Sequence, residues 1–375
     1  MRYSADLLGW EQTNVPINGI FRSMIRVCVL PVAGREDPTQ MLMMQAVNQQ
    51  GRFEMRHGVH ARFFAATRTC LRDRPDLLYF DWISRYIIGR SSLVSFIKMV
   101  AFWLDVQIAV NIFRRPVVWS LHNLQSHESG PGASWERRLQ RYFARHVTII
   151  RVFSQGAVAR ASILLGVKRE KLRVVPVGNY VEYYPSEITP AAARVRLGLG
   201  AGDFVLLWLG SIRPYKGLHE LIEIFRQVAL PHWRLVIAGK PFIAAYAAEI
   251  AALAKADERI QVDARFIPEA ELQVFYNAAD VAVLPFAEVE NTSSLIVAMG
   301  FRKPVVAPDL GVIGERLCRQ RELVYQPGGL ADALTVLAAL PRERLEEIGE
   351  ANYTEVTKYQ WKDMGVIFQE LLEKK

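Results

Sequence analysis

Residues 204–225 read FVLLWLGSIRPYKGLHELIEIF, and their pattern decides the fold class. The apolar run Phe204–Leu209 predicts a buried strand, residues 210–217 predict a loop, and His219 begins a predicted helix that continues to Val228. An apolar strand followed by a short loop and a helix is typical of a parallel sheet that helices cover on both faces.

The same alternation continues in both directions along the chain. Apolar runs predict further strands at 233–238, 260–262, 281–284 and 304–307 downstream, and at 27–30, 77–80, 117–121, 147–150 and 172–176 upstream, where residues 39–50 predict a helix. Residues 183–202, with two prolines and three glycines, interrupt the series. We therefore expect an α/β protein with two doubly wound, Rossmann-like domains, residues 1–184 and 185–355, and a ligand in the cleft between them.

The composition excludes several classes of protein. Of the 375 residues, 51% are apolar and 22% are charged, which is too apolar for a disordered chain and too charged for a polytopic membrane protein. The net charge of +8 is polarised, because residues 1–185 carry +12 and the remainder carries −4. A basic half indicates a polyanionic partner, and without a basic motif interleaved with aromatic residues we expect an anionic membrane surface and no nucleic acid.

The cysteines and the first residues indicate the cellular compartment of the protein. Cys28, Cys70 and Cys318 lie far apart without a C-x-x-C spacing, which argues against a disulfide scaffold or a zinc module. The first 14 residues lack the basic start and the apolar core of a secretory signal. We expect a protein on the cytoplasmic side of the membrane.

Residues 92–115 form the one stretch that suggests a membrane-spanning helix. Its length is sufficient, but Lys98, Asp105, Gln107 and Asn111 interrupt it. An amphipathic helix with a wide apolar face fits better. Two interpretations stay open: a helix packed on its own sheet, or a partly exposed helix that seats the basic domain on a bilayer as a monotopic attachment.

Two loops of the second domain are suited to bind a phosphate group. The first, residues 210–217, carries Arg213 and Lys216 between a strand and a helix, where both cations can neutralise a diphosphate. The second follows the strand that ends at Pro285, and its residues Asn291, Thr292, Ser293 and Ser294 can cap the helix they begin. Both loops leave the same edge of the predicted sheet, so they can grip one pyrophosphate.

The first domain supplies candidate groups for proton transfer. His122, His127 and Glu128 lie in the segment that follows the strand at 117–121, and Asp81 follows the strand at 77–80. The sequence has no phosphate-binding G-x-x-x-x-G-K-[ST] loop, no D-x-D pair and no His/Cys cluster with metal spacing. We therefore expect no metal ion, and the charge of a bound diphosphate must be met by helix ends and by Arg213 and Lys216.

At this level the chain resembles GT-B glycosyltransferases, a group close to the retaining family-four enzymes. The resemblance rests on Gly210…Lys216-Gly217 and on Pro285…Ala298-Met-Gly-Phe-Arg-Lys-Pro304-Val-Val-Ala307, and it implies the GT-B fold with a nucleotide-sugar donor in the second domain. Tyr359-Gln-Trp361 and the residues after it, within 356–375, resemble the terminal helix that returns to the first domain. The sequence departs from the retaining pattern of two glutamates eight residues apart, because it has Val289 and Val297 at those positions.

A narrower resemblance comes from D-W after an early strand, H-N-L-x-x-H-E, I-R-P-Y-K-G and N-T-S-S-L, which are similar to inverting bacterial β-mannosyltransferases of exopolysaccharide biosynthesis. It implies transfer of mannose from GDP-mannose to a polyprenyl-diphosphate-linked oligosaccharide. The catalytic candidates are then Glu128, His127, His122 and Asp81; the donor-binding candidates are Arg213, Lys216, Glu290, Asn291, Thr292, Ser293, Ser294 and Ile267, the last near a base pocket at 265–268.

Two alternatives remain at this stage. The chain can be a retaining glycosyltransferase that uses a UDP-sugar, or a non-catalytic binding subunit with a GT-B fold that lost activity with its second glutamate. The sequence names neither the sugar nor the acceptor.

Overall fold

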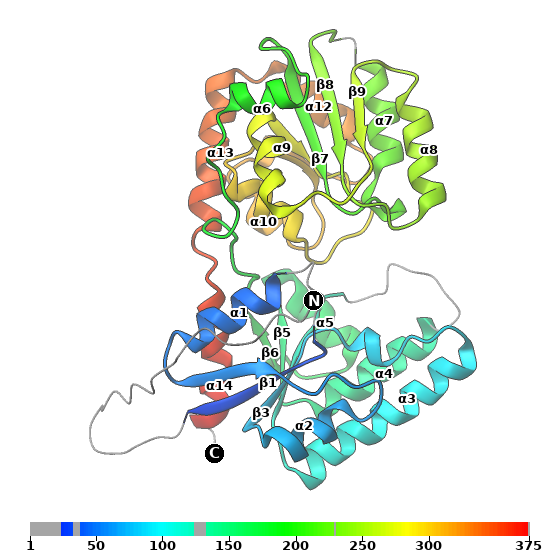
Figure 1. Ribbon diagram of the computed structural model, residues 1–375, viewed down its shortest axis with the longest axis vertical. Helices are drawn as coiled ribbons and strands as arrows, with labels where there is room; N and C mark the ends of the chain where they lie inside the picture. Colours follow the sequence, from blue (N-terminus) through cyan, green and yellow to red (C-terminus); the bar gives the residue numbers. More distant parts are fainter. Residues whose placement is uncertain (1–23, 33–37, 124–132, 229, 374–375) are drawn as a thin grey trace, which may run out of the picture.

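The computed structural model describes residues 24–32, 38–123, 133–228 and 230–373, and it contains two α/β domains stacked end to end (Figure 1). Each domain is built on a six-stranded parallel sheet, and the carboxyl edges of both sheets face the junction between the domains. The two doubly wound domains predicted from the sequence are confirmed.

The first domain has the strand order β2-β1-β3-β4-β5-β6. Its strands are β1 (Ile25–Leu30), β2 (Phe53–His57), β3 (Leu77–Phe80), β4 (Val117–Ser120), β5 (Ile149–Val152) and β6 (Leu172–Val174), and its helices are α1 (Thr39–Asn48), α2 (Ala65–Asp73), α3 (Ser92–Gln107), α4 (Ala133–His146) and α5 (Gln155–Leu165). Successive strand residues point to opposite faces. Cys28 and Leu30 therefore pack with α2 to α5, whereas Val27 and Val29 pack with α1 and the C-terminal helix.

The second domain has the strand order β12-β11-β10-β7-β8-β9. Its strands are β7 (Phe204–Leu209), β8 (Trp233–Ala238), β9 (Ile260–Asp263), β10 (Val281–Val283), β11 (Val305–Pro308) and β12 (Val324–Tyr325). Its helices are α6 (Pro190–Arg196), α7 (Leu218–Gln227), α8 (Ala244–Ala254), α9 (Leu272–Ala278), α10 (Ser293–Gly300), α11 (Ile313–Arg316), α12 (Leu330–Ala339) and α13 (Arg342–Val356). One face of the sheet packs on α7, α8 and α12, and the other on α9 and α10.

Every predicted strand forms within two residues of its expected position, whereas strands β2 and β12 and helix α6 were not predicted. β2 reads FEMRH, whose alternating polar residues look like a surface segment, and β12 has only two residues. Both are edge strands, where one side is unpaired and burial is incomplete. Helix α6 lies inside residues 183–202, the stretch that interrupts the predicted series, where Thr189 caps its first turn and Pro190 stands at its first position.

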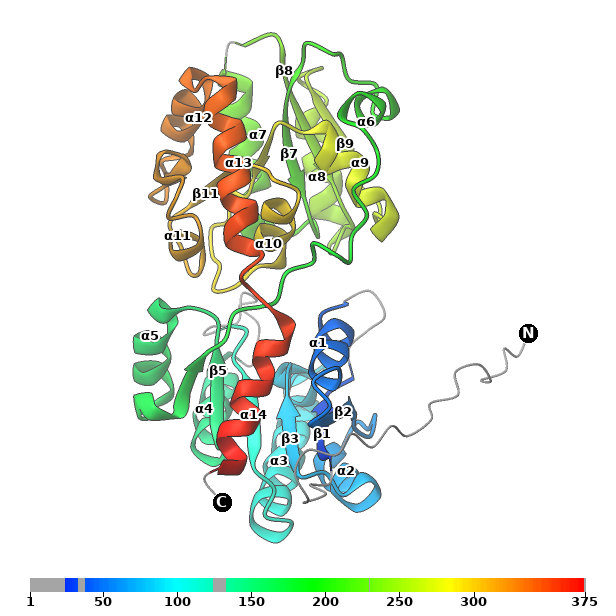
Figure 2. The same ribbon diagram turned by 90° about the vertical axis from the view of Figure 1, so that its left-hand side faces the viewer.

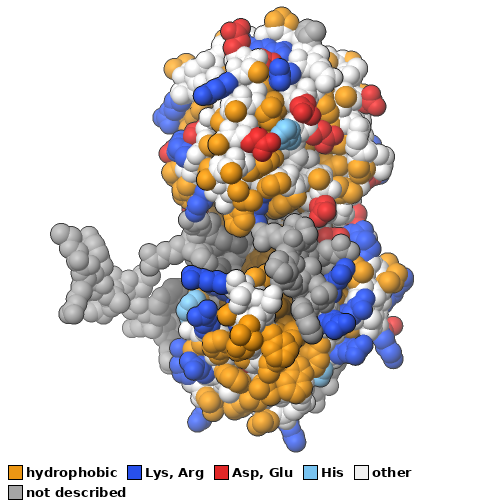
Figure 3. Space-filling view, turned by 90° about the vertical axis from the view of Figure 1, so that its right-hand side faces the viewer, with side chains coloured by type: hydrophobic (Ala, Val, Ile, Leu, Met, Phe, Trp, Pro, Cys, Tyr) orange, Lys and Arg blue, Asp and Glu red, His pale blue; other side chains and the backbone are white. Residues whose placement is uncertain are grey.

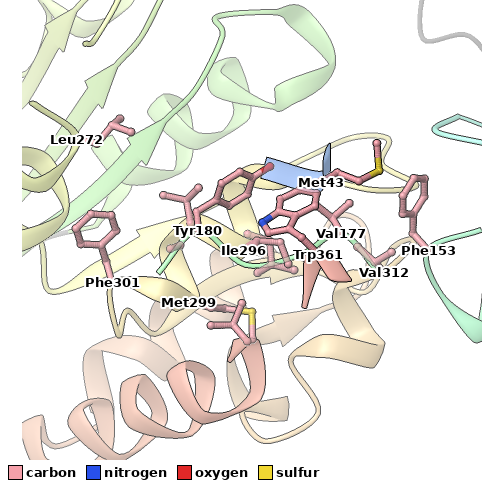
Figure 4. Close-up of a cluster of buried hydrophobic side chains, with 14 of the residues drawn as sticks. Met43, Phe153, Val177, Tyr180, Leu272, Ile296, Met299, Phe301, Val312 and Trp361 are labelled. Carbon is pink, nitrogen blue, oxygen red and sulfur yellow. The ribbon is translucent and has the colours of Figure 1, made fainter. Parts of the chain in front are cut away.

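The chain crosses between the domains twice, once after β6 and once after α13. The second crossing ends in α14 (Met364–Glu373), which packs on the first domain as the family resemblance predicted (Figure 2). Trp361 joins the two crossings, since its indole Nε1 donates to the Asn179 carbonyl at 2.7 Å and its ring contacts Tyr180 with centroids 5.4 Å apart. Figure 4 shows Trp361 and Tyr180 within a buried cluster that continues from one domain into the other.

Candidate active site

A cavity of about 340 Å³ lies between the two domains, at the carboxyl edges of both sheets. Its lining from the first domain and the crossing segment is Pro38, Thr39, Trp82, His122, Asn123, Val177, Tyr180 and Tyr184. Its lining from the second domain is Tyr215, Lys216, Phe286, Glu288, Val289, Asn291, Thr292, Ser293, Ser294 and Val297. The cavity therefore brings His122 together with Lys216 and residues 291–294, which the sequence had assigned to different roles.

On the first-domain side, Asp81 and His122 form a hydrogen-bonded pair. The sheet places β3 beside β4, so Asp81 after β3 and His122 after β4 leave neighbouring strands at the same edge. His122 Nε2 lies 2.5 Å from Asp81 Oδ1, and Gln40 Nε2 donates to Asp81 Oδ2 at 2.8 Å. The Trp82 indole stacks on the imidazole with centroids 3.9 Å apart, which fixes the plane of the ring.

The pair has the electrostatics of an oriented base. Burial acts to raise the pKa of Asp81, but the charge of His122 and the hydrogen bonds from His122 and Gln40 outweigh it, so the pKa is lowered below its usual value. An ionised carboxylate only accepts hydrogen bonds. His122 Nε2 is therefore the donor to Asp81, and in a neutral imidazole this places the lone pair on Nδ1, the arrangement of a carboxylate-oriented base.

A buried network behind the pair holds it in place. The Tyr79 hydroxyl lies 3.5 Å from Asp81 Oδ1 and 2.6 Å from Ser120 Oγ. Arg151 Nη1 donates to the Tyr79 hydroxyl at 3.3 Å, and its Nε and Nη2 donate to the carbonyls of Val175 and Pro176 at 2.8 and 2.6 Å. These hydrogen bonds connect β3, β4 and β5 to the crossing segment, so the base is fixed on rigid strands.

On the second-domain side, the two predicted loops meet. Gly217 adopts φ +72°, and a Cβ there would lie 1.7 Å from the Pro285 carbonyl oxygen, so only glycine permits the contact. The Ala287 N–H donates to the Tyr215 carbonyl at 2.9 Å and ties the loops together. At Gly210, an added Cβ would lie 3.0 Å from Lys216 Nζ and 3.5 Å from Ser294 Oγ. The ammonium and the hydroxyl therefore converge beside the Gly210 backbone.

Lys216 carries a poorly solvated charge. Burial, with a smaller contribution from the Arg213 charge, lowers the pKa of Lys216 to about 8. Its Nζ lies 5.6 Å from the centroid of the Phe286 ring, and none of the described carboxylates forms an ion pair with it. An ammonium in such a site is compensated when an anion enters the cavity.

Helix α10 opens onto the same cavity. Thr292 is its N-cap residue, but the threonine side chain makes no capping hydrogen bond, which corrects the expectation that the hydroxyls here cap the helix. The Asn291 Oδ1 atom is buried and has no partner among the described residues. The first-turn N–H groups of a helix without a side-chain cap carry a partial positive charge that suits an anionic group.

The remaining predicted site residues lie elsewhere or outside the described residues. Arg213 packs on the Phe242 ring, 3.6 Å from its centroid, beside the cavity and not in its lining. Glu290 pairs with Arg160 of α5 at 2.9 Å, so it links the domains, and Ile267 is buried in the core. His127 and Glu128 lie outside the described residues.

The sequence also missed residues that shape the cavity. Gln40, Trp82 and Tyr180 were not singled out, although they hold Asp81, the His122 ring and the Thr39 hydroxyl respectively. The aspartate–tryptophan pair directly after an apolar strand was the one signal that pointed to Trp82. Gln40 gives no such signal, because it lies on a helix that the sequence alone does not place against β3.

Comparisons with known proteins give glycosyltransferases as relatives of this chain. Residues 203–339 match the family described as "Glycosyl transferases group 1". A GDP-mannose:glycolipid 4-beta-D-mannosyltransferase of Xanthomonas campestris pv. campestris is 25% identical over 250 residues, which are 67% of this chain and 66% of that enzyme. A D-inositol 3-phosphate glycosyltransferase of Nocardia farcinica is 28% identical over 211 residues, covering 53% of this chain and 46% of that protein.

Solved structures resemble the chain over nearly its whole length. The Anabaena protein Alr3699/HepE, crystallised with UDP and glucose, superposes with a TM-score of 0.70 at 17% identity and covers 94% of this chain and 100% of its own. WaaG, a glycosyltransferase involved in lipopolysaccharide biosynthesis, gives a TM-score of 0.62 at 14% identity, covering 92% and 99%. The resemblance stated from the motifs is confirmed: the chain has the GT-B glycosyltransferase fold, and its residues 203–339 match the group 1 glycosyltransferases.

Proposed function

We propose that the chain transfers a sugar from a nucleoside-diphosphate donor to an acceptor hydroxyl inside the interdomain cavity, with inversion at the anomeric carbon. One observation carries the proposal. A carboxylate-oriented histidine on the first domain faces the same 340 Å³ cavity as an uncompensated ammonium and an open helix start on the second domain. A base and a diphosphate site on opposite walls are the two elements that glycosyl transfer requires.

In this proposal His122 is the general base. Its Nδ1 takes the proton of the acceptor hydroxyl while the acceptor oxygen bonds to the anomeric carbon and the bond to the diphosphate oxygen breaks. The Asp81 carboxylate then stabilises the imidazolium, and Trp82 holds its plane. General base catalysis of this kind contributes roughly 10²- to 10⁴-fold to the rate.

Lys216 and the start of α10 stabilise the leaving diphosphate. The ammonium lies beside Gly210 together with Ser294 Oγ, and the first N–H groups of α10 face the same cavity. Preorganised donors aimed at a developing charge are worth about 3–4 kcal/mol each in transition-state stabilisation. We propose that these groups do so without a metal ion.

The choice of inversion is supported by the lining at the two positions where retaining relatives carry glutamates. Val289 and Val297 both border the cavity, so these positions contribute apolar surface. The oriented base lies on the opposite domain, which suits attack from the face opposite the leaving group. A retaining mechanism is the alternative, and the anomeric configuration of the product decides between them.

For the substrates we propose GDP-mannose as donor and a polyprenyl-diphosphate-linked oligosaccharide of exopolysaccharide assembly as acceptor, at the cytoplasmic face of the inner membrane. The support is the match to a GDP-mannose:glycolipid mannosyltransferase along 66% of that enzyme's length, just under two thirds. The other curated relative described above carries the name of a D-inositol 3-phosphate glycosyltransferase and is matched over about half its length.

Calorimetry with GDP, UDP, dTDP and their sugars, each with and without EDTA, tests the donor site. We expect one nucleotide to bind in the presence of EDTA, Lys216→Ala and Ser293→Ala to weaken it at least about tenfold, and the exposed control Lys168→Ala to leave it unchanged. Binding that needs a metal ion would contradict the metal-free site. Binding without transfer to any glycolipid acceptor would favour a non-catalytic subunit.

A further inference from the structure

Helix α3 presents its apolar face to solvent. The exposed side chains Leu93, Phe96, Ile97, Val100, Trp103 and Leu104 are between 39% and 68% accessible. Their spacing of three and four residues puts them on one stripe of the helix. Figure 3 shows hydrophobic side chains gathered on this face of the first domain, with Lys and Arg side chains around its rim.

The two charged residues of the same helix point inward. Lys98 is 8% exposed and donates to the carbonyls of Arg85 and Ile88, at 2.7 and 2.5 Å. Asp105 is 2% exposed and accepts from the first N–H groups of α2, those of Ala66 and Thr67, at 2.9 and 2.7 Å. The buried side of α3 thus combines these two charged residues with the apolar Phe102 and Val106, while the exposed side carries a continuous apolar stripe, which is unusual for a surface helix.

We propose that this face, the α3 surface of the six exposed side chains named above, docks into an anionic lipid bilayer. The flanking charge supports this occupant over an apolar protein partner. Residues 82–146 hold nine Lys and Arg against three Asp and Glu, and without the buried Lys98 and Asp105 this leaves eight cations against two acids. Arginines at 138 and 145 share the side of α4 on which Tyr142 contacts Trp103 of α3. An apolar stripe bordered by cations is the pattern of an interfacial helix.

The fold shows why α3 lies on a bilayer and does not cross it. Among the described residues one helix, Ser92–Ile112, is long and apolar enough to span a membrane. However, it connects β3 to β4, which pair as parallel neighbours, and Lys98 and Asp105 anchor it to the domain. Insertion across a membrane would break both attachments.

The position of α3 also relates the bilayer to the cavity. Trp82 lines the cavity, and a short turn (Ile83–Tyr86) leads from it to the exposed Ile88 and the first turn of α3. A helix that follows a parallel strand begins at the carboxyl edge of that strand, on the cavity side. The start of the α3 surface therefore lies within six residues of Ile88 along the chain, on the same side of the first domain as the cavity lining at Trp82. The docking proposal stands on exposure and charge, so it holds or fails independently of the transfer reaction.

Flotation of the full chain with vesicles tests the proposal. We expect binding to vesicles of phosphatidylcholine mixed with phosphatidylglycerol, weaker binding to phosphatidylcholine alone, and weakening by salt. The double variant Ile97→Ser/Leu104→Ser should lower the partition coefficient at least about tenfold, because two inserted apolar side chains are lost. The control Ile163→Ser, at a 79% exposed residue of α5, should not change it. Brominated lipids should quench the tryptophan fluorescence of the wild type more than that of the Trp103→Phe variant.

The thermal unfolding of the double variant checks that it is folded, and its melting temperature should match the wild type because both changed side chains are exposed. Equal vesicle binding by the wild type and the double variant would overturn the proposal. Self-association without lipid that the double variant abolishes would also overturn it, in favour of a second copy of this chain as the occupant.

Discussion

Replacing Lys216 by methionine separates the stability of the second domain from its binding of a diphosphate. The ammonium is buried beside Phe286, and no described carboxylate pairs with it, so the folded protein has to hold a charge that water solvates better. A fall in pKa from 10.5 to about 8 corresponds to about 3 kcal/mol of destabilisation while the group is charged. Lys216 borders an open cavity, where water offsets part of this destabilisation. We therefore expect Lys216→Met to raise the free energy of unfolding by about 1–3 kcal/mol at pH 7.

The pH dependence gives the sign of the effect. Below pH 8 the lysine is charged in both the folded and the unfolded chain, so the advantage of the methionine is complete. Between pH 8 and 10.5 the folded wild type loses the proton while the unfolded chain keeps it, so the wild type becomes relatively more stable and the advantage shrinks. Urea unfolding at pH 7 and pH 10 measures both values, with Lys168→Met as the exposed control.

The Lys216→Met variant should also lose the stabilisation that a bound nucleoside diphosphate gives the wild type. A saturating nucleoside diphosphate raises the melting temperature of the wild type by mass action, and this increase should be absent in Lys216→Met. Two results would refute the reasoning: a variant less stable than the wild type at pH 7, or a gain of equal size at pH 7 and pH 10. Either would mean that the ammonium has a partner or solvent that offsets its burial.

Three further predictions concern the geometry of the site and of the domain junction. Asp81→Asn should lower kcat about 10²-fold or more with little change in KM, because the amide no longer fixes the His122 tautomer, and steady-state kinetics with a pH profile measures it. Gly217→Ala should destabilise the second domain by at least about 2 kcal/mol in urea unfolding, since its Cβ would overlap the Pro285 carbonyl. Glu315→Gln should lower the free energy of unfolding by about 1 kcal/mol, because the Glu315 carboxylate caps the first turn of α5 across the junction. An unchanged midpoint of urea unfolding would show that solvent replaces the cap.

The fold was largely predictable because its central strands are short apolar runs between turn residues. Edge strand β2 was not, since Glu54 and Arg56 interrupt its pattern and its place is set by pairing with β1. Sequence alone put Asp81 and His122 at the ends of two strands, but their contact depends on β3 and β4 being neighbours. Strand order is a property of the tertiary structure, so the pair was seen only as two separate candidates.

The orientation of α3 could not be predicted from the sequence either. The spacing of polar and apolar residues shows that the helix has a polar and an apolar side, but it does not show which side faces inward. The interior of the first domain supplies partners for the polar side, namely the carbonyls before α3 for Lys98 and the free N–H groups of α2 for Asp105. Local hydrogen-bonding needs of neighbouring elements thus decide a question that periodicity leaves open.

The return of α14 to the first domain has a consequence for biosynthesis. Phe368 is fully buried against Phe53 and Tyr79, with ring centroids 5.7 and 6.1 Å apart, and Arg173 pairs with Glu370. These late residues leave the ribosome after the whole second domain has been made. The first domain to be synthesised is therefore the last to complete its core, and until then the face of its sheet that α14 covers is exposed to chaperones and proteases.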